Sequence, residues 1–198
     1  MSDKVGFRKF AFAKMQKKYP YHVAGSKKVM QSLSALIGQH KPKSILFYHP
    51  MDHELDLRPL MRKERNKRKV YLPFMVDDSF KMVAYRLPLR TAKYGIIEPR
   101  NSLLNINTVE MIIVPIVGVD RHFKRIGFGK GMYDRFVARL DNKPLIIFVQ
   151  TTLCYTKQSI TDHYDIQADY IITPKDFLKI EAKRHDKRSF YRRYNSIS

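Results

Sequence analysis

The run from Arg125 to Asp134, RIGFGKGMYD, combines the residue types that hold a phosphate group. Glycine at positions 127, 129 and 131 lets the backbone turn sharply, so its amide N–H groups can approach an anion closely. Arg125 and Lys130 add positive charge, and Asp134 is placed to ligate a magnesium ion beside the phosphates. The spacing matches neither a Walker A loop nor the dinucleotide fingerprint G-x-G-x-x-G. We predict a nucleotide-phosphate site; the alternative is a glycine turn whose cations stay in solvent.

Two predicted elements position this run. The apolar segment Met111–Val119 before it is typical of a buried strand, and Met132–Leu140 after it has apolar residues at helical spacing. A strand followed by a glycine turn and a helix start brings amide groups and the positive end of the helix to one place. The predicted elements therefore support the phosphate site.

Predicted helices and strands alternate along the rest of the chain. Helices are expected at 7–18, 26–37 and 56–68, and strands at 44–49, 69–72 (stopped by Pro73), 80–85, 145–149 and 170–173, with an irregular stretch at 87–107. This order predicts an α/β fold: one three-layer domain over residues 1–198 with a mainly parallel, Rossmann-like sheet flanked by helices. Right-handed crossovers would bring His49, Glu54 and Asp165 to the sheet edge that carries the glycine run.

Composition excludes several classes of protein. The chain has no apolar run near the roughly 20 residues that span a bilayer. Its first residues also lack a signal-peptide core, so we expect a cytoplasmic protein without a membrane partner. A single cysteine, Cys154, excludes an internal disulfide and any multi-cysteine metal site, and is expected to be a small buried hydrophobe.

A net charge of +20, from 38 Lys and Arg against 18 Asp and Glu, raises the question of a nucleic-acid partner. Much of the excess lies in 58–69 and in a basic C-terminal extension, 175–198, expected to be helical or partly disordered. The extension places Phe190, Tyr191 and Tyr194 among arginines, a pattern that could stack on bases. We favour a solvated tail without a partner, because no nucleic-acid-binding motif accompanies the charge.

A collinear set of motifs resembles the 5-formyltetrahydrofolate cyclo-ligase family, also called methenyltetrahydrofolate synthetases. The set covers most of residues 4–174: Lys4-x-x-x-Arg8, Met51 with Glu54-Leu-Asp56, Lys69-Val-Tyr-Leu-Pro73, Gly95-Ile-Ile-Glu-Pro99, Val114-Pro115 with Asp120, Arg125–Asp134, and Asp165-x-x-x-Asp169-x-x-x-Thr173. The resemblance implies that ATP and Mg²⁺ drive conversion of 5-formyltetrahydrofolate to 5,10-methenyltetrahydrofolate, with release of ADP and phosphate, in a protein expected to be a monomer.

The resemblance also assigns residues. It implies that ATP contacts Lys4, Arg8, Arg125, Ile126, Gly127, Phe128, Gly129, Lys130, Gly131, Met132 and Tyr133. It places the folate against His49, Met51, Glu54, Phe128, Met132 and Tyr133, and the metal on Asp134 and Asp165. It gives catalysis to Arg125, Lys130 and Tyr133.

The chain departs from the family pattern at several positions. Met132 replaces the first Tyr of the family's G-Y-Y-D, Ile116 the Gly of V-P-G and Val119 the usual Phe before Asp120, while Gln150 is a candidate for the glutamine after a strand. Two alternatives to the ligase therefore stay open. One is a basic RNA-binding protein that reuses the fold, and the other is a folate-binding relative whose catalysis is impaired by Met132.

Overall fold

The computed structural model describes residues 3–16, 22–91, 97–181 and 190–193. Pro59 stands in the first turn of the helix α3 (Arg58–Glu64), where its missing N–H costs nothing. The described residues form α1 (Lys4–Gln16), α2 (His22–His40), β1 (Ser44–Leu46), α3 (Arg58–Glu64), β2 (Lys69–Val76), β3 (Ser79–Ala84), β4 (Arg90–Thr91), β5 (Ile97–Glu98), β6 (Met111–Pro115), β7 (Gly118–Val119), β8 (Arg125–Ile126), α4 (Met132–Val137), β9 (Leu145–Val149), β10 (Tyr170–Ile172), β11 (Phe177–Glu181) and β12 (Phe190–Arg193).

Eight of these strands make one sheet in the order β12-β11-β10-β9-β6-β1-β2-β3. The pairings from β10 through β9, β6 and β1 to β2 are parallel. The pairings at the two edges, β2 with β3 and β10 with β11 and β12, are antiparallel. The predicted α/β class with a mainly parallel sheet is therefore confirmed.

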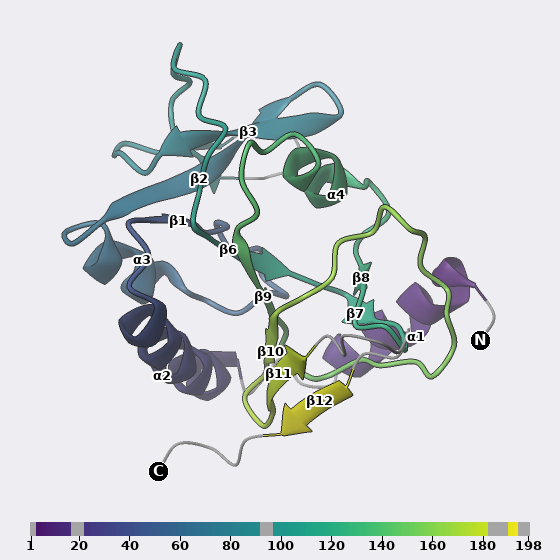
Figure 1. Ribbon diagram of the computed structural model, residues 1–198. Coiled ribbons are helices and arrows are strands. Elements are labelled where there is room, and N and C mark those ends of the chain that lie inside the picture. The colour runs from purple at the N-terminus through teal and green to yellow at the C-terminus, as the bar shows by residue number, and fades with distance from the viewer. Residues whose placement is uncertain (1–2, 17–21, 92–96, 182–189, 194–198) are drawn as a thin grey trace.

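Helices cover both faces of the sheet, as Figure 1 shows, with α2 and α3 on one side and α4 on the other. Met111 and Ile113 of β6 pack under α2 and α3, while Ile112 and Val114 face the α4 side. Because successive side chains of a strand alternate between faces, a strand covered on both sides must be apolar at every position. This explains the unbroken apolar run that the sequence shows.

A smaller cluster holds α1 outside the main sheet. Phe7, Ala11 and Met15, spaced four residues apart on one side of α1, pack with Val117, Ile126 and Cys154. Cys154 is thus the buried small hydrophobe that the sequence predicts. The cluster fixes α1 against the β7–β8 ribbon, which leads into the glycine run.

Several predicted boundaries were wrong. The strand expected at 111–119 ends at Pro115, and Gly118–Val119 turns away as β7 to pair with β8. The helix expected at 132–140 ends at Val137. Pro73 does not stop β2. The pairing of β1 with β2 ends at Tyr71, so beyond it β2 has a partner strand, β3, on one side only, and a proline without an N–H is tolerated there.

The C-terminal extension also differs from its prediction in the part that the structure describes. Phe177–Glu181 and Phe190–Arg193 are strands that extend the sheet, not a helix. Positions 182–189 and 194–198, like 17–21 and 92–96, lie outside the described residues, so the predicted helix end at 17–18, Gly95, Arg188 and Tyr194 receive no structural account. None of the described helices is long and apolar enough to cross a membrane.

Candidate active site

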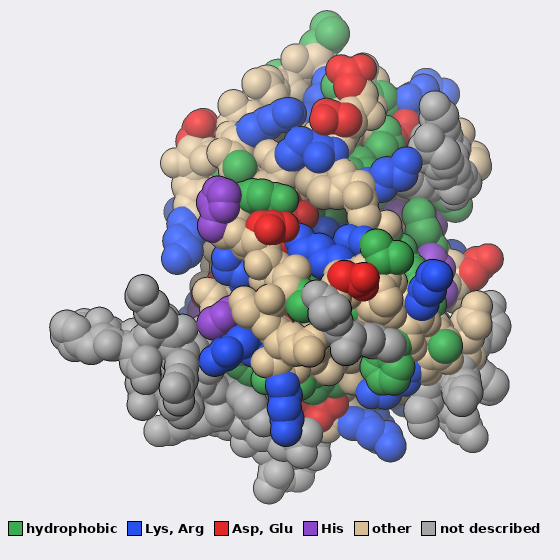
Figure 2. Space-filling model, turned by 90° about the vertical axis from the view of Figure 1, so that its right-hand side faces the viewer, with side chains coloured by type: hydrophobic (Ala, Val, Ile, Leu, Met, Phe, Trp, Pro, Cys, Tyr) green, Lys and Arg blue, Asp and Glu red, His purple; other side chains and the backbone are tan. Residues whose placement is uncertain are grey.

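A hollow of about 370 Å³ lies where α1, the β8–α4 loop and the segment before β10 meet. We call it the phosphate pocket. Figure 2 shows basic side chains gathered in a hollow on the side of the molecule that carries α1 and α4, with acidic side chains at its edge. Ten residues predicted from the sequence line the pocket: Lys4, Arg8, Arg125, Ile126, Gly127, Gly129, Lys130, Gly131, Asp134 and Asp165.

Backbone geometry explains the glycines of this loop. Gly129 has φ of 102° and Gly131, which caps α4, has φ of 61°, a left-handed conformation that a side chain disfavours. At Gly127 the reason is space, because a Cβ there would collide with the guanidinium of Arg125. α4 itself is only six residues long, so loop amides and side-chain cations, more than a helix dipole, make the pocket attractive to anions.

Arg125 is a buried cation at the inner end of the pocket. Its Nη1 lies 3.4 Å from Oδ2 of Asp134, and its guanidinium lies 5.0 Å from the ring centre of Tyr133. Burial lowers the pKa of Arg125, but Asp134 and Tyr133 act against this, and a guanidinium stays charged. Its Nε has no hydrogen-bond partner among the described residues, which leaves a buried donor for an anionic ligand.

α1 brings two further cations to the pocket from one side of the helix. Lys4 Nζ lies 2.6 Å from a carboxylate oxygen of both Asp162 and Asp165, and Arg8 donates from Nε to the Gly127 carbonyl at 2.8 Å. Burial lowers the pKa of Lys4, yet its bonds to Asp162 and Asp165 outweigh burial and raise it overall. Lys4 is therefore a fixed positive charge at neutral pH.

Glu54 lies in the loop after β1, near enough to Arg125 for the two charges to interact. Its Oε2 accepts a hydrogen bond from the Met51 amide at 3.0 Å. Burial raises the pKa of Glu54 to about 7, although the Met51 amide and the charge of Arg125 pull it down. The Tyr133 hydroxyl is kept neutral, since burial and then the charge of Glu54 raise its pKa. Glu54, Arg125 and Tyr133 thus form a coupled polar group beside the pocket.

An aromatic group borders the same region. The ring of Phe128 lies 5.5 Å from that of Phe12 in α1 and 5.2 Å from that of His53, which precedes Glu54. Phe128 keeps 37% of its surface exposed, so the group offers an apolar face at the mouth of the site. Met132, by contrast, packs against the core cluster on the α4 side of the sheet.

The predicted substrate residues are brought together less completely. The charges of Glu54 and Arg125 both act on Tyr133, and Phe128 lies beside His53 with its ring partly exposed. His49 is half-buried, with its pKa lowered by burial and by Arg58, and Met51 is exposed. Phe128, Met132 and Tyr133 do not line the phosphate pocket, so their predicted contact with ATP stays a prediction.

Sequence reasoning missed three residues of the phosphate pocket: Arg135, Ala138 and Tyr164. Arg135 donates to the Lys130 carbonyl at 2.6 Å and pairs with Asp78, so it also holds the loop in place. Ala138 lies four positions after Asp134, so helical spacing indicates that it shares the side of the helix that carries Asp134. No local pattern singles out Tyr164, because it reaches the pocket only through the fold.

Comparisons with known proteins show which family the chain resembles. The profile of the 5-formyltetrahydrofolate cyclo-ligase family matches residues 4–174. The chain belongs to that family. The 5-formyltetrahydrofolate cyclo-ligase of Haemophilus influenzae is 28% identical over 151 residues, which are 70% of this chain and 79% of that protein. The one from Mycoplasma genitalium is 29% identical over 148 residues, 73% of this chain and 81% of that protein.

Solved structures show the same fold. The 5,10-methenyltetrahydrofolate synthetase of Aquifex aeolicus superposes with a TM-score of 0.73 at 28% identity, covering 94% of this chain and 95% of that one. A synthetase from Mycoplasma pneumoniae gives 0.65 at 22% identity, covering 87% and 99%, which is a likeness of fold. The chain is accordingly an ATP-dependent ligase of folate one-carbon metabolism, with 5-formyltetrahydrofolate cyclo-ligase activity.

Two residues matched to the cyclo-ligase motifs, Asp120 and Gln150, lie outside the phosphate pocket and make hydrogen bonds that hold neighbouring segments together. Asp120 accepts hydrogen bonds from the amides of His122 and Lys124 and from Thr161, and so joins the β7–β8 turn to the segment before Asp165. The Gln150 amide donates to the Val117 carbonyl and accepts from the Cys154 amide. Asp120 and Gln150 therefore support the segments that carry Arg125 and Asp165, and neither residue lines the phosphate pocket.

Proposed function

We propose that the phosphate pocket binds ATP with its γ-phosphate toward Arg125, and that 5-formyltetrahydrofolate lies beside it against Glu54, Tyr133 and Phe128. One observation supports this above all: three segments far apart in sequence bring Lys4, Arg8, Arg125 and Lys130 around one hollow with two carboxylates. A triphosphate needs this density of positive charge and backbone amides.

The chemistry requires activation of an amide-like oxygen. The N5-formyl oxygen is a poor leaving group, so the γ-phosphoryl group is transferred to it and ADP leaves. The folate N10 then attacks the formyl carbon and gives up its proton, and the C–O bond breaks as phosphate departs. The product is the 5,10-methenyl bridge. Such a transfer depends on positioning and charge neutralisation more than on a covalent enzyme nucleophile.

Each named residue has a part in this scheme. Arg125 and Lys130 stabilise the charge that develops on the transferred phosphoryl group, together with the loop amides of Gly127–Gly131. Tyr133, whose pKa is raised, keeps its proton and can donate a hydrogen bond to the oxygen that is phosphorylated. Glu54 accepts hydrogen bonds from the reduced pterin and aligns it, and Phe128 contributes its exposed ring face.

Asp134 and Asp165 fit a magnesium ion completed by the nucleotide. Both line the phosphate pocket, and the described residues contain no group of three or more His, Cys, Asp or Glu that would form a metal site without ATP. Mg²⁺ commonly takes one or two carboxylates and completes its shell with phosphate oxygens and water. Bound there, it would neutralise charge on the β- and γ-phosphates. Lys4, now on Asp165, would turn toward the phosphates.

Substitution of the two central cations tests the scheme. In purified protein with ATP, magnesium and 5-formyltetrahydrofolate, formation of methenyltetrahydrofolate is followed by its near-ultraviolet absorbance. Lys130→Ala and Arg125→Ala should each lower kcat/KM by at least about 100-fold, the scale for loss of one charge-stabilising donor. Arg139→Ala is the matched control, since it removes an exposed arginine near α4 that does not line the pocket.

The assay also has an outcome that contradicts the scheme. Near-normal turnover in Lys130→Ala and Arg125→Ala, with circular dichroism unchanged, would remove these residues from the phosphoryl-transfer site. Because Arg125 is buried, the activity of Arg125→Ala is interpreted only if the unfolding midpoint of this variant stays close to that of the parent protein. Lys130 is exposed and gives the cleaner comparison.

A further inference from the structure

Lys4 holds two carboxylates at once at the phosphate pocket. Its Nζ lies 2.6 Å from Oδ2 of Asp162 and 2.6 Å from Oδ2 of Asp165. Asp165 also belongs to the pair of carboxylates that fits magnesium in the proposed ATP complex, and its side chain is only 9% exposed. One ammonium group and one metal ion thus call on the same buried carboxylate.

The segment that carries the two acids is itself fixed. Lys124, in the turn between β7 and β8, donates from Nζ to the carbonyls of Asp162 and His163 at 2.7 and 3.1 Å. The Thr161 hydroxyl donates to the carboxylate of Asp120 in the same turn. These bonds hold the chain that leads to the two acids.

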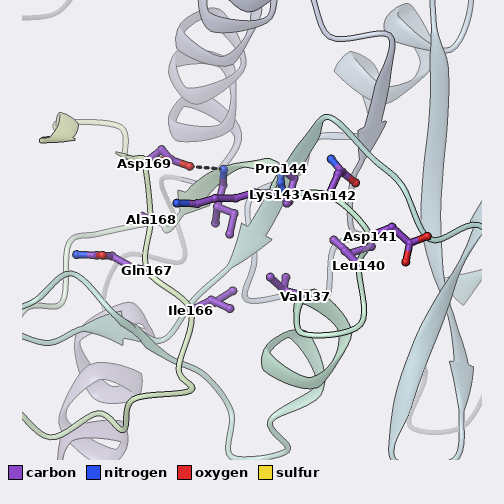
Figure 3. Close-up of a pocket in the computed structure, with 11 residues that line it drawn as sticks. Val137, Leu140, Asp141, Asn142, Lys143, Pro144, Ile166, Gln167, Ala168 and Asp169 are labelled. Atoms are coloured by element: carbon purple, nitrogen blue, oxygen red, sulfur yellow. Dashed lines mark hydrogen bonds between the residues drawn. The ribbon is translucent and has the colours of Figure 1, made fainter. Parts of the chain in front are cut away.

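The chain after Asp165 is fixed by packing. Ile166 is buried in the core cluster on the α4 side of the sheet, and Val137 packs against the same cluster. Figure 3, a close-up of the hollow beside α4, shows these two side chains pointing toward one another. Its dashed line marks the hydrogen bond from the Ile146 amide to Asp169, at 2.8 Å. The Asp165 carboxylate therefore keeps its place when a ligand binds.

Lys4 is the partner that can move. It is the first residue of α1, and its ammonium group stands at the end of a flexible four-carbon stem. Each acid keeps another donor when Lys4 leaves. The Tyr164 hydroxyl donates to Oδ2 of Asp162 at 3.0 Å, and the Asp162 amide donates to Oδ2 of Asp165 at 2.7 Å. Lys4 can thus be exchanged for another cation without stranding a buried acceptor.

An ammonium group and a divalent ion on Asp165 would oppose one another. Any cation that this carboxylate holds lies close to Lys4 Nζ, and two positive charges so close together repel strongly. ATP changes the balance, because its phosphates offer Lys4 an anionic partner and give the metal further oxygen ligands.

We propose that Lys4 competes with magnesium for Asp165: without nucleotide the ammonium group keeps divalent ions off this carboxylate, and Mg²⁺ binds together with ATP, which draws Lys4 to its phosphates. The inference rests on the proposed ATP site and adds how metal and nucleotide depend on each other there. In the rival arrangement Lys4 stays on Oδ2 while the metal takes the other oxygen of Asp165. Removing Lys4 then has no more effect than removing any neighbouring charge.

Binding of Mn²⁺ without nucleotide tests the competition. Mn²⁺ takes the same oxygen ligands as Mg²⁺, and electron paramagnetic resonance measures its free concentration. We expect Lys4→Met to bind Mn²⁺ at least about tenfold more tightly than the parent protein, because the opposing charge is gone. Adding Asp165→Asn to Lys4→Met should abolish this gain, which locates the site.

Two matched variants separate displacement from general electrostatics. Lys4→Arg keeps a cation on the two acids and should bind Mn²⁺ as the parent protein does. Arg8→Met removes a cation of the same pocket that bonds the Gly127 carbonyl instead of the acids, so Mn²⁺ affinity should change less than about threefold. Equal Mn²⁺ affinity in Lys4→Met and the parent protein, or an equal gain in Arg8→Met, would overturn the inference.

Calorimetry with preformed Mg·ATP distinguishes this failure from that of the ATP site. Lys4→Met should weaken Mg·ATP binding about fivefold or more while it strengthens binding of the metal alone, because Lys4 is a phosphate ligand in one case and a competitor in the other. Loss of structure would weaken both. If the parent protein does not bind Mg·ATP, the proposed ATP site fails too; if it binds and the Mn²⁺ affinities are equal, only the competition fails.

Discussion

Glu54 shows how one residue ties stability to pH in this site. Burial raises its pKa from the ordinary value of 4.5 to about 7, so the folded protein binds more protons than the unfolded chain between these values. The raised pKa leaves the free energy of unfolding unchanged below about pH 4.5. The free energy of unfolding then falls as pH rises from 4.5 through 7, because the unfolded chain releases the proton first. Above pH 7 the ionised Glu54 carboxylate lowers the free energy of unfolding by up to about 3 kcal/mol.

Glu54→Gln, which cannot ionise, should remove this pH dependence. Unfolding by urea at pH 5 and pH 8 should show that the variant gains stability relative to the parent protein at the higher pH, by about 2–3 kcal/mol. Comparing the two proteins cancels every other titrating group. Parallel pH profiles would mean that the Glu54 carboxyl has an ordinary pKa, and its proposed place beside the pterin would lose its electrostatic support.

At the scale of elements, α1 can present Lys4 and Arg8 to the phosphate pocket only because adjacent side chains on the same side of the helix anchor it. Phe7 is 1% exposed and packs against Gly118, where a Cβ would collide with its ring. Lys4 and Arg8, one turn apart, reach the phosphate pocket from the same helix. Loosening the anchor should therefore weaken ATP binding without altering any residue that touches the phosphates.

Phe7→Ala tests this dependence. Removing a fully buried ring typically costs about 3–5 kcal/mol in a core, and here most of that loss should appear as detachment of α1. We expect the KM for ATP to rise at least about fivefold, since part of the protein no longer presents Lys4 and Arg8. Val5→Ala, an apolar truncation on the exposed side of the same helix, is the control. An unchanged KM would show that α1 does not contribute to ATP binding.

At the scale of the whole molecule, some of the 38 Lys and Arg residues are paired with acidic side chains, which the net charge of +20 already counts. In the basic stretch 58–69, Arg58 pairs with Asp56 and Arg68 with Glu64. A further set of cations lines the phosphate pocket, and the proposed ATP site explains them without a nucleic-acid partner. β12 at the edge of the sheet carries part of the basic tail.

We expect single-stranded RNA to bind more weakly than micromolar at about 0.15 M salt, as non-specific binding does. Deleting 182–198, which removes β12 and leaves β11 as the sheet edge, should not change that weak affinity. Fluorescence anisotropy with a labelled oligonucleotide at several salt concentrations measures both. Micromolar or tighter binding that disappears with the tail would favour the RNA-binding alternative.

The fold was largely readable from residue patterns because both faces of the central strands are covered. Ile112 and Val114 had to be as apolar as Met111 and Ile113, and that continuous run identifies a parallel sheet. The short elements were not readable. Where β6 ends, how far α4 runs and whether Pro73 fits into β2 depend on neighbouring strands, which local propensity does not encode.

The sequence by itself determined the chemistry of the pocket, because glycines, cations and carboxylates at 125–134 suit few ligands other than phosphate. It also determined the family, through motifs in one order along the chain. Only the tertiary structure decided that Lys4 meets Asp165 across 161 positions and that Phe12 and His53 join Phe128. These contacts arise from packing between elements distant in sequence, and no local spacing records which elements will touch.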